Sequence, residues 1–164
     1  MVVERDENRG RGQAEAQLQG IRQMVDRLEH ANDCDGDPET CDLEDIDMLS
    51  GMDIWPHERE ATEEERERYH DANEAMDAIS EDPLSVEVRS DWFTPGEEAE
   101  PGEFRILLCT GGPAVQIRGE IGPYGQPDRA WLEFQDWFTP WTELITTGAD
   151  HDALLTYARQ FLGY

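Results

Sequence analysis

The sequence predicts an α+β protein: N-terminal acidic helices, then an antiparallel β-meander of four to five strands, then a C-terminal helix packed on the sheet. Three observations predict this class. Before Pro83, apolar residues recur at three- and four-residue steps, as at Leu18, Ile21 and Val25. After Pro83, apolar and polar residues alternate, as in half-buried strands. From Asp150 the helical period returns.

Three helices are expected in the N-terminal half. Residues 1–12 read as a loose polar tail, and the first helix follows over residues 13–30. Its apolar stripe can dock on the sheet or pair with a second copy as a homodimer. A short second helix is expected over residues 43–52. The third runs from Thr62, where a capping box begins, to Asp82, because the following proline disfavours helical backbone.

The pattern of residues after Pro83 predicts the sheet. Turn residues separate runs of alternating polarity, and Thr110-Gly-Gly-Pro113 reads as a tight hairpin. The expected strands are 84–89, 103–109, 114–121, 129–136 and an edge strand at 141–146. The side chains expected to face the terminal helix are Phe104, Ile106, Leu108, Val115, Ile117, Leu132 and Phe134. We divide the chain into an acidic helical region, 1–82, and a sheet with its terminal helix, 83–164; one single domain also fits.

Charge is the strongest compositional signal. The formal net charge is −26, from 39 acidic residues and 13 bases, all of them Arg. Residues 1–82 hold 26 acids and 8 Arg, whereas 83–164 hold 13 acids and 5 Arg. Such a field repels nucleic acids and anionic membranes and attracts basic partners. A high-salt habitat or a need for solubility would produce the same composition.

No catalytic motif is present, so we expect neither an enzyme nor a cofactor. Three cysteines form no disulfide framework, and the chain shows no apolar leader or membrane span. These features predict a cytoplasmic protein with reduced cysteines. Cys34 and Cys41 are separated by six residues, with no His pair in support, which is not a zinc spacing. The four histidines, expected to be exposed, are His30, His57, His70 and His151.

One acidic loop partly fits a calcium site. Asp33, Asp35, Asp37 and Glu44 occupy positions 1, 3, 5 and 12 of an EF-hand loop. The sixth position needs Gly for a sharp turn, and Pro38 has a locked negative φ. We therefore expect a solvated acidic loop and no metal site, with calcium as a weak alternative.

The acidic helices are the leading candidate for partner binding. Carboxylates at helical spacing can stand at distances that resemble duplex phosphates, so a rigid acidic surface can occupy a groove that normally holds DNA. The residues assigned to this surface are Glu58, Glu60, Glu63, Glu64, Glu65, Glu67, Asp71, Glu74 and Asp77 on the third helix and its lead-in, with Asp33, Asp35, Asp37, Asp42, Glu44, Asp45 and Asp47 as a second band.

The second face of the sheet is the alternative interface. Trp and Arg often anchor protein interfaces, and the residues concerned are Arg105, Arg118 and Trp131, with Trp137 and Trp141 at the rim. The competing interpretation is that the N-terminal helices cover this face and make the tryptophans ordinary core.

Residues 80–164 resemble a group of small acidic proteins carried by phages, prophages and plasmids of bacteria. The resemblance rests on Asp82-Pro-Leu-Ser-Val-Glu-Val-Arg-Ser90, Glu103 to Glu120, and Arg129-Ala-Trp-Leu-Glu-Phe-Gln-Asp-Trp137. It transfers no functional residues. What it implies is a setting, because mobile elements encode acidic proteins that block restriction or CRISPR systems, some as DNA mimics. The expected function is therefore inhibition of a bacterial defence protein, with a non-mimic interaction module second and an enzyme third.

Overall fold

The fold comes from a computed structural model and is described for residues 3–37, 41 and 62–162. The helices are α1 (Val3–Asp33), α2 (Glu63–Tyr69), α3 (Ala72–Glu81) and α4 (Gly148–Leu162). The strands are β1 (Ser85–Ser90), β2 (Pro101–Cys109), β3 (Ala114–Ile121), β4 (Pro127–Gln135) and β5 (Thr142–Glu143). This is the α+β class that the sequence predicts.

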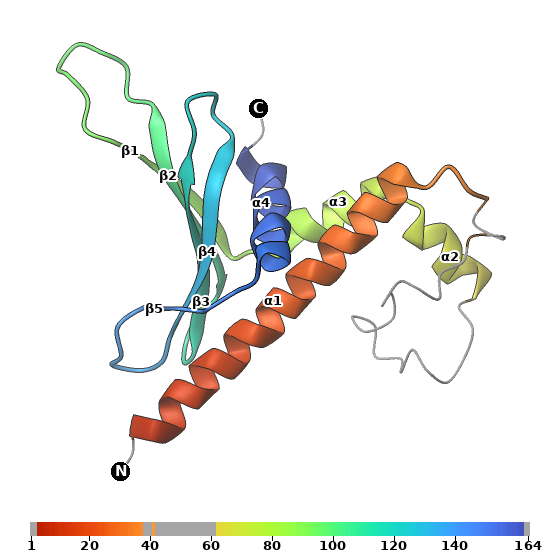
Figure 1. The fold of residues 1–164 in the computed structure, drawn as a ribbon, viewed down its shortest axis with the longest axis horizontal. Helices are drawn as coiled ribbons and strands as arrows, with labels where there is room; N and C mark the ends of the chain where they lie inside the picture. The colour runs from red at the N-terminus through yellow and green to blue at the C-terminus, as the bar shows by residue number, and fades with distance from the viewer. Residues whose placement is uncertain (1–2, 38–40, 42–61, 163–164) are drawn as a thin grey trace.

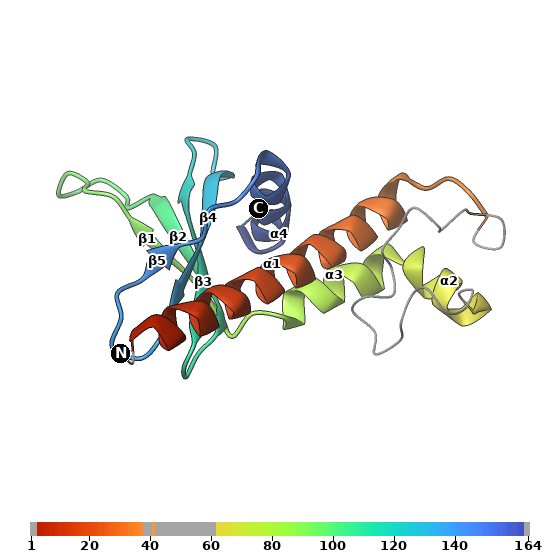
Figure 2. The same cartoon turned by 60° about the horizontal axis from the view of Figure 1, so that its bottom comes forward.

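The sheet is an antiparallel meander whose strands lie in sequence order, β1-β2-β3-β4-β5. Helices α1 and α4 lie on the same side of it (Figure 1). The long α1 crosses the sheet with its first half and continues well beyond it, alongside α3, to the end where α2 lies (Figure 2). The protein therefore has a sheet end and a helical end, joined by α1.

The hydrophobic core lies between the sheet and these two helices. All seven side chains expected to face the terminal helix are buried there. They meet the apolar stripe of α1, including Ile21 and Val25, and Leu154 and Tyr157 of α4, in one continuous cluster. The stripe of α1 is thus docked on the sheet, the first of the two expected outcomes.

Two predictions about helix bounds were wrong. Residues 3–12 are not a loose tail but the start of α1. The helix expected from Thr62 to Asp82 is two helices, because the chain leaves helical geometry at His70 and Asp71 starts α3 as its N-cap. Asp71 accepts hydrogen bonds from two backbone N–H groups of the next turn, which stabilises the new start. The short helix expected over 43–52 lies outside the described residues.

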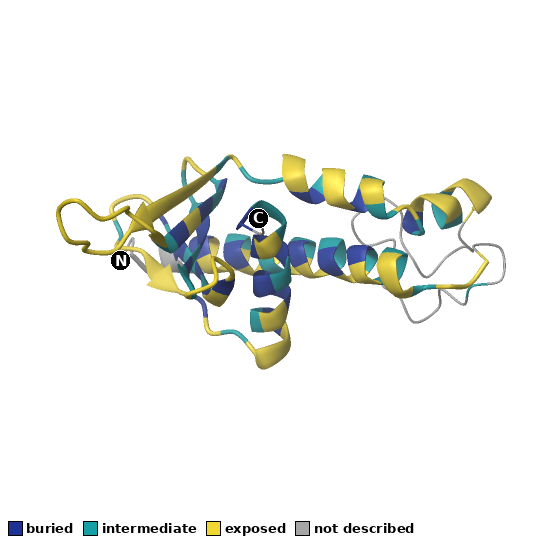
Figure 3. Cartoon of the chain, turned by 90° about the horizontal axis from the view of Figure 1, so that it is seen from above, coloured by how far each residue is buried: buried dark blue, intermediate teal, exposed yellow. Residues whose placement is uncertain are grey.

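One face of the sheet remains open in the described part of the chain. The interpretation that the N-terminal helices cover the face of Arg105 and Trp131 was wrong for the helices described, because α1 packs on the opposite face with α4. Exposed residues are concentrated on the outer edge of the sheet, the β1–β2 loop and the helical end (Figure 3).

Candidate functional site

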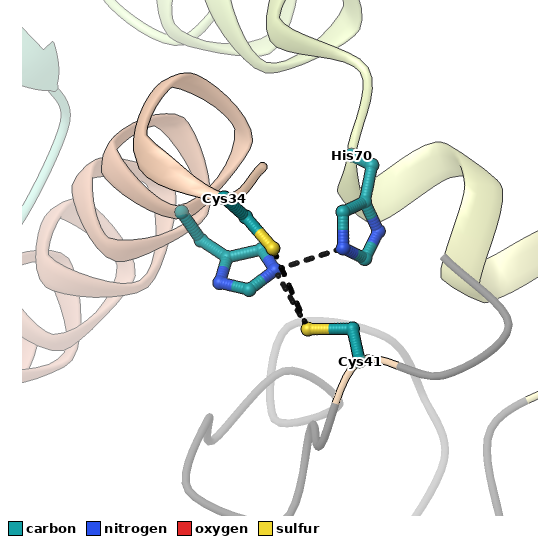
Figure 4. A group of neighbouring side chains, drawn as sticks. Cys34, Cys41 and His70 are labelled. Atoms are coloured by element: carbon teal, nitrogen blue, oxygen red, sulfur yellow. Dashed lines mark hydrogen bonds between the residues drawn. The ribbon is translucent and has the colours of Figure 1, made fainter. Parts of the chain in front are cut away.

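Four potential metal ligands converge at the helical end of the molecule: His30, Cys34, Cys41 and His70. His30 lies in the last turn of α1, and Cys34 follows one turn later, immediately after the helix. Cys41 approaches from the segment that follows, and His70 approaches from the junction of α2 and α3 (Figure 4). Each of the four residues is half-buried.

The ligand atoms lie very close together. All four are within 4.8 Å of one another. The two Sγ atoms of Cys34 and Cys41 are 3.6 Å apart, and the Cys41 Sγ is 3.6 Å from the His30 Nε2. The Nε2 atoms of His30 and His70 are 3.1 Å apart. The four side chains therefore point their donor atoms toward one common centre.

Local backbone structure explains this convergence. The N–H of Cys34 donates to the carbonyl of His30, which continues the helical pattern and places both side chains on one face. His70 is the C-cap of α2, and its N–H donates to the Glu67 carbonyl. The break between α2 and α3 thus turns the His70 imidazole toward the end of α1.

Neighbouring polar groups hold the cluster in place. The Nδ1 of His70 lies 2.7 Å from the Arg66 carbonyl oxygen, which can only accept, so Nδ1 carries a proton and Nε2 faces the cluster. The guanidinium of Arg66 donates to the Cys41 carbonyl at 2.9 Å. The His30 ring also contacts the Tyr69 ring, with centroids 5.4 Å apart.

The cluster environment favours a neutral His30. Burial, and then the charge of the neighbouring His70, lower the pKa of the His30 imidazole from its ordinary value of 6.5. A neutral imidazole is the form that binds metal ions.

Sequence reasoning missed this site. We expected His30 and His70 on exposed surfaces and found no His pair beside the cysteines, and both interpretations were wrong. A signal was present in the four-residue step from His30 to Cys34 at the end of a predicted helix. The contribution of His70 could not be read from spacing, because it depends on the unexpected break between α2 and α3. Within the described residues, this is the one group of His, Cys, Asp or Glu side chains that lie close enough together to hold a metal ion.

The structure gives no support to the alternative calcium site. Asp33, Asp35 and Asp37 are exposed, and Glu44 lies outside the described residues.

The expected partner-binding acids divide into two groups. Some have structural roles: Glu65 completes the capping box with Thr62, Asp71 caps α3, and Glu74 pairs with Arg27 and Arg68. Others are exposed on the helical end: Asp33, Asp35, Asp37, Glu63, Glu64, Glu67 and Asp77. Glu58, Glu60, Asp42, Asp45 and Asp47, with Glu44, lie outside the described residues.

The open face of the sheet carries cross-strand ion pairs. Arg105 pairs with Glu87 of the neighbouring strand. Arg118 lies 3.4 Å from Glu103, which also pairs with Arg89. The guanidinium groups of this face therefore already have carboxylate partners within the chain, which weakens them as anchors for another molecule.

The tryptophans differ in exposure. Trp131 is half-buried, and its indole N–H donates to Glu133 at 2.8 Å. Trp137 is 61% exposed and Trp141 is 38% exposed, so the two expected rim residues do lie at the rim.

The pentapeptide Asp-Trp-Phe-Thr-Pro occurs twice in the sequence, at residues 91–95 and 136–140, and its two copies lie in different environments. The first copy follows β1 in a fully exposed loop, where Trp92 has no burial at all. In the second copy, Asp136 is buried and accepts the Trp137 N–H, and Thr139 donates to the Asp136 carbonyl. The Trp137 indole then lies against the backbone of Gly112.

No protein-family model, curated protein or solved structure matches the chain. Among the described helices, none combines the length and apolar character needed to cross a membrane.

Proposed function

We propose that this protein binds a basic, DNA-binding surface on a partner protein through the exposed acids of its helical end, as a DNA mimic. We call Asp33, Asp35, Glu63, Glu67 and Asp77 the acidic surface. The partner class we propose is a nuclease or surveillance complex of a bacterial restriction or CRISPR system, met in the cytoplasm of the host. The protein acts as an inhibitor and not as an enzyme.

One observation carries this proposal: predicted partner-binding acids, among them Glu63, Glu67 and Asp77, are exposed at the end of the molecule that lies away from the core. Folding explains only some of them: Glu63 lies in the first turn of α2, where the helix dipole favours an acid, but the like charge of Glu67 one turn later opposes the helix. Their neighbours Glu65, Asp71 and Glu74 do have structural roles. The remaining carboxylates are available to a basic partner, whose attraction would be long-range and sensitive to salt.

A pull-down from bacterial host extract, with and without added duplex DNA, tests the proposal. We expect the captured protein to be a DNA-binding nuclease or surveillance complex that duplex DNA displaces. Binding should weaken steeply with salt, because basic grooves hold polyanions by charge. Capture that neither salt nor DNA reverses would contradict the proposal.

A pair of variants distinguishes the effect of where the acids lie from the effect of the protein's net charge on binding. Neutralising Glu63, Glu67 and Asp77 to their amides should weaken binding about tenfold or more and flatten its salt dependence. The matched control neutralises Glu97, Glu98 and Glu100, which are exposed on the loop between β1 and β2 at the sheet end. The control removes the same charge elsewhere and should leave binding nearly unchanged. Glu65 is excluded, because its loss would break the cap of α2.

The second candidate is an interaction module, or a homodimer, that binds through the sheet. The observation in its favour is the exposure of Trp137 and Trp141 at the rim of the open face. Under this function, Trp137→Ala or Trp141→Ala would weaken binding more than removal of the three acids. The ion pairs of Arg105 and Arg118 within the chain make this candidate the weaker one.

A further inference from the structure

We propose that His30, Cys34, Cys41 and His70 form a structural zinc site that fastens α2 and α3 to the end of α1. This inference is independent of the proposed partner and rests on the geometry of the four side chains.

Three of the six separations between the ligand atoms match the edges of a zinc tetrahedron, and all six lie within 4.8 Å. With Zn–S bonds of about 2.3 Å and Zn–N bonds of about 2.0–2.1 Å, ideal edges are about 3.8 Å between sulfurs, about 3.6 Å between sulfur and nitrogen, and about 3.3 Å between nitrogens. The corresponding distances here are 3.6 Å between Cys34 and Cys41, 3.6 Å between Cys41 and His30, and 3.1 Å between His30 and His70.

The chemical nature of the four ligand atoms indicates which metal ion the site would bind. Two thiolates and two imidazoles in tetrahedral arrangement suit Zn²⁺, whereas Ca²⁺ and Mg²⁺ require oxygen ligands. Four protein ligands also complete the coordination sphere, as in structural zinc sites, whereas catalytic sites keep one position for water. The inferred role is therefore to hold the fold together.

The carbonyl of Arg66 supplies the expected supporting contact. Metal-bound histidines usually donate their second ring N–H to a carbonyl or carboxylate, which fixes the ring and its tautomer. The 2.7 Å contact from His70 Nδ1 to Arg66 directs Nε2 toward the cluster in this way.

The helical end needs such a fastening. α2 has seven residues, fewer than an isolated helix needs to be stable in water, and Tyr69 is its one buried residue. Zinc binding can provide the missing folding free energy, because the metal joins segments that bury little apolar surface together.

A disulfide between Cys34 and Cys41 is the competing explanation. A bonded pair of sulfurs is about 2.05 Å apart, well below the separation here. A disulfide would also give no reason for His30 and His70 to point at the same place.

The first test measures metal content of the full-length protein, purified under reducing conditions without added metal and analysed by inductively coupled plasma mass spectrometry. We expect about one zinc per chain. Co²⁺ exchanged into the protein should give visible d–d bands typical of tetrahedral coordination and a near-ultraviolet thiolate-to-cobalt band. Absence of stoichiometric zinc together with absence of these bands would overturn the inference, as would an intact-mass measurement showing a Cys34–Cys41 disulfide in place of metal.

Variants locate the site. Cys34→Ser, Cys41→Ser and His70→Gln should each weaken zinc affinity by more than about tenfold, since even loss of a supporting contact costs 10–100-fold. Cys109→Ser and His151→Gln are the matched controls; these residues lie on β2 and α4 and should leave the metal content at one per chain. Retention of zinc by the three ligand variants, or its loss from the controls, would contradict the assignment.

A titration of the wild-type protein tests the site without variants, so that misfolding of a variant cannot affect the result. Zinc is removed by chelation under reducing conditions, and Zn²⁺ alone is returned in steps. We expect saturation at one equivalent, and a parallel titration with Co²⁺ alone should restore the d–d bands. Failure of the stripped protein to bind one equivalent of either Zn²⁺ or Co²⁺ would overturn the inference.

Discussion

The two ends of α1 are stabilised in different ways. Near the sheet, Ala14, Ile21 and Val25 are fully or almost fully buried among side chains of the strands and α4. At the far end, α1 meets α2 mainly through polar groups: Arg27 donates to the Arg68 carbonyl, and His30 enters the cysteine–histidine cluster. The comparison teaches that an apolar core holds the sheet end, whereas the helical end depends on a few specific contacts.

This difference also fits the charge. The acid-rich α2 has one buried residue, Tyr69, so it offers little apolar surface that could hold it on a core. A metal cross-link fixes the positions of α1, α2 and α3 while leaving their outer faces charged. The metal site would thus hold the helices in place while the acidic surface stays exposed to a partner.

The largest predicted effect is at the sheet end. Gly119 lies on β3 between β2 and β4, and a Cβ there would collide with the Arg129 carbonyl oxygen and the Phe104 ring. Gly119→Ala should therefore lower the free energy of unfolding by about 3 kcal/mol, because backbone and core must move apart. Urea denaturation measures the loss.

The matched control is Gly20→Ala on α1. A Cβ at this position meets nothing within 4 Å, so alanine should raise stability by up to about 1 kcal/mol through helix propensity. Equal effects of the two substitutions would show that the close approach at Gly119 does not constrain the sheet.

The second prediction concerns the connection between the two ends. The buried Tyr157 hydroxyl of α4 donates to Asp82, at the C-cap of α3, over 2.6 Å. Burial and this bond raise the pKa of Tyr157 far above its ordinary value. Tyr157→Phe should cost about 1.5–3 kcal/mol, the range for a hydrogen bond to a charged group. Thermal denaturation checks it, and an unchanged midpoint would remove this bond from the stabilising contacts.

The third prediction concerns the helical end alone. Thr62 accepts the Glu65 N–H, and Glu65 accepts the Thr62 N–H, in a reciprocal capping box. Thr62→Ala should destabilise α2 locally by about 1 kcal/mol. Amide exchange should accelerate in α2 while the sheet keeps its protection. Acceleration across the whole protein would mean that the two ends unfold together.

The smallest effect is a pH dependence at the sheet end. Asp150 is buried; burial opposes its charge, but hydrogen bonds from Thr147 and the contact with Arg22 outweigh burial and lower its pKa below the ordinary 3.8. A lowered pKa stabilises the fold above pH about 4, and this contribution is lost as the pH falls through the folded-state pKa. Wild type should exceed Asp150→Asn in stability at pH 7, and the difference should shrink below pH 4. A difference independent of pH would exclude the charge as its cause.

The fold was largely predictable from the sequence because the period of apolar residues changes sharply at Pro83. Alternation in β2, β3 and β4 assigned the core-facing side chains, and the structure confirms them. The bounds of α1 were missed because its first turns carry little apolar pattern. The α2–α3 break was missed because a capping signal at Asp71 is weak beside a continuous helical stripe.

The site was less predictable than the fold for a physical reason. A metal site depends on where side chains meet in space, and here one ligand lies on α1 and another 40 residues later at a helix junction. The acids, by contrast, were visible as composition, but composition does not show which of them stabilise the fold. The structure separates Glu65, Asp71 and Glu74, which have partners in the chain, from the acidic surface.

Hydrogen–deuterium exchange before and after zinc chelation tests most directly whether metal holds the helical end while an apolar core holds the sheet. We predict that removing zinc accelerates exchange at the end of α1 and in α2, with β2, β3, β4 and α4 unchanged, and that returning one equivalent of Zn²⁺ restores protection. Equal protection at the helical end with and without zinc would contradict the claim, as would a loss of protection spread equally over both ends.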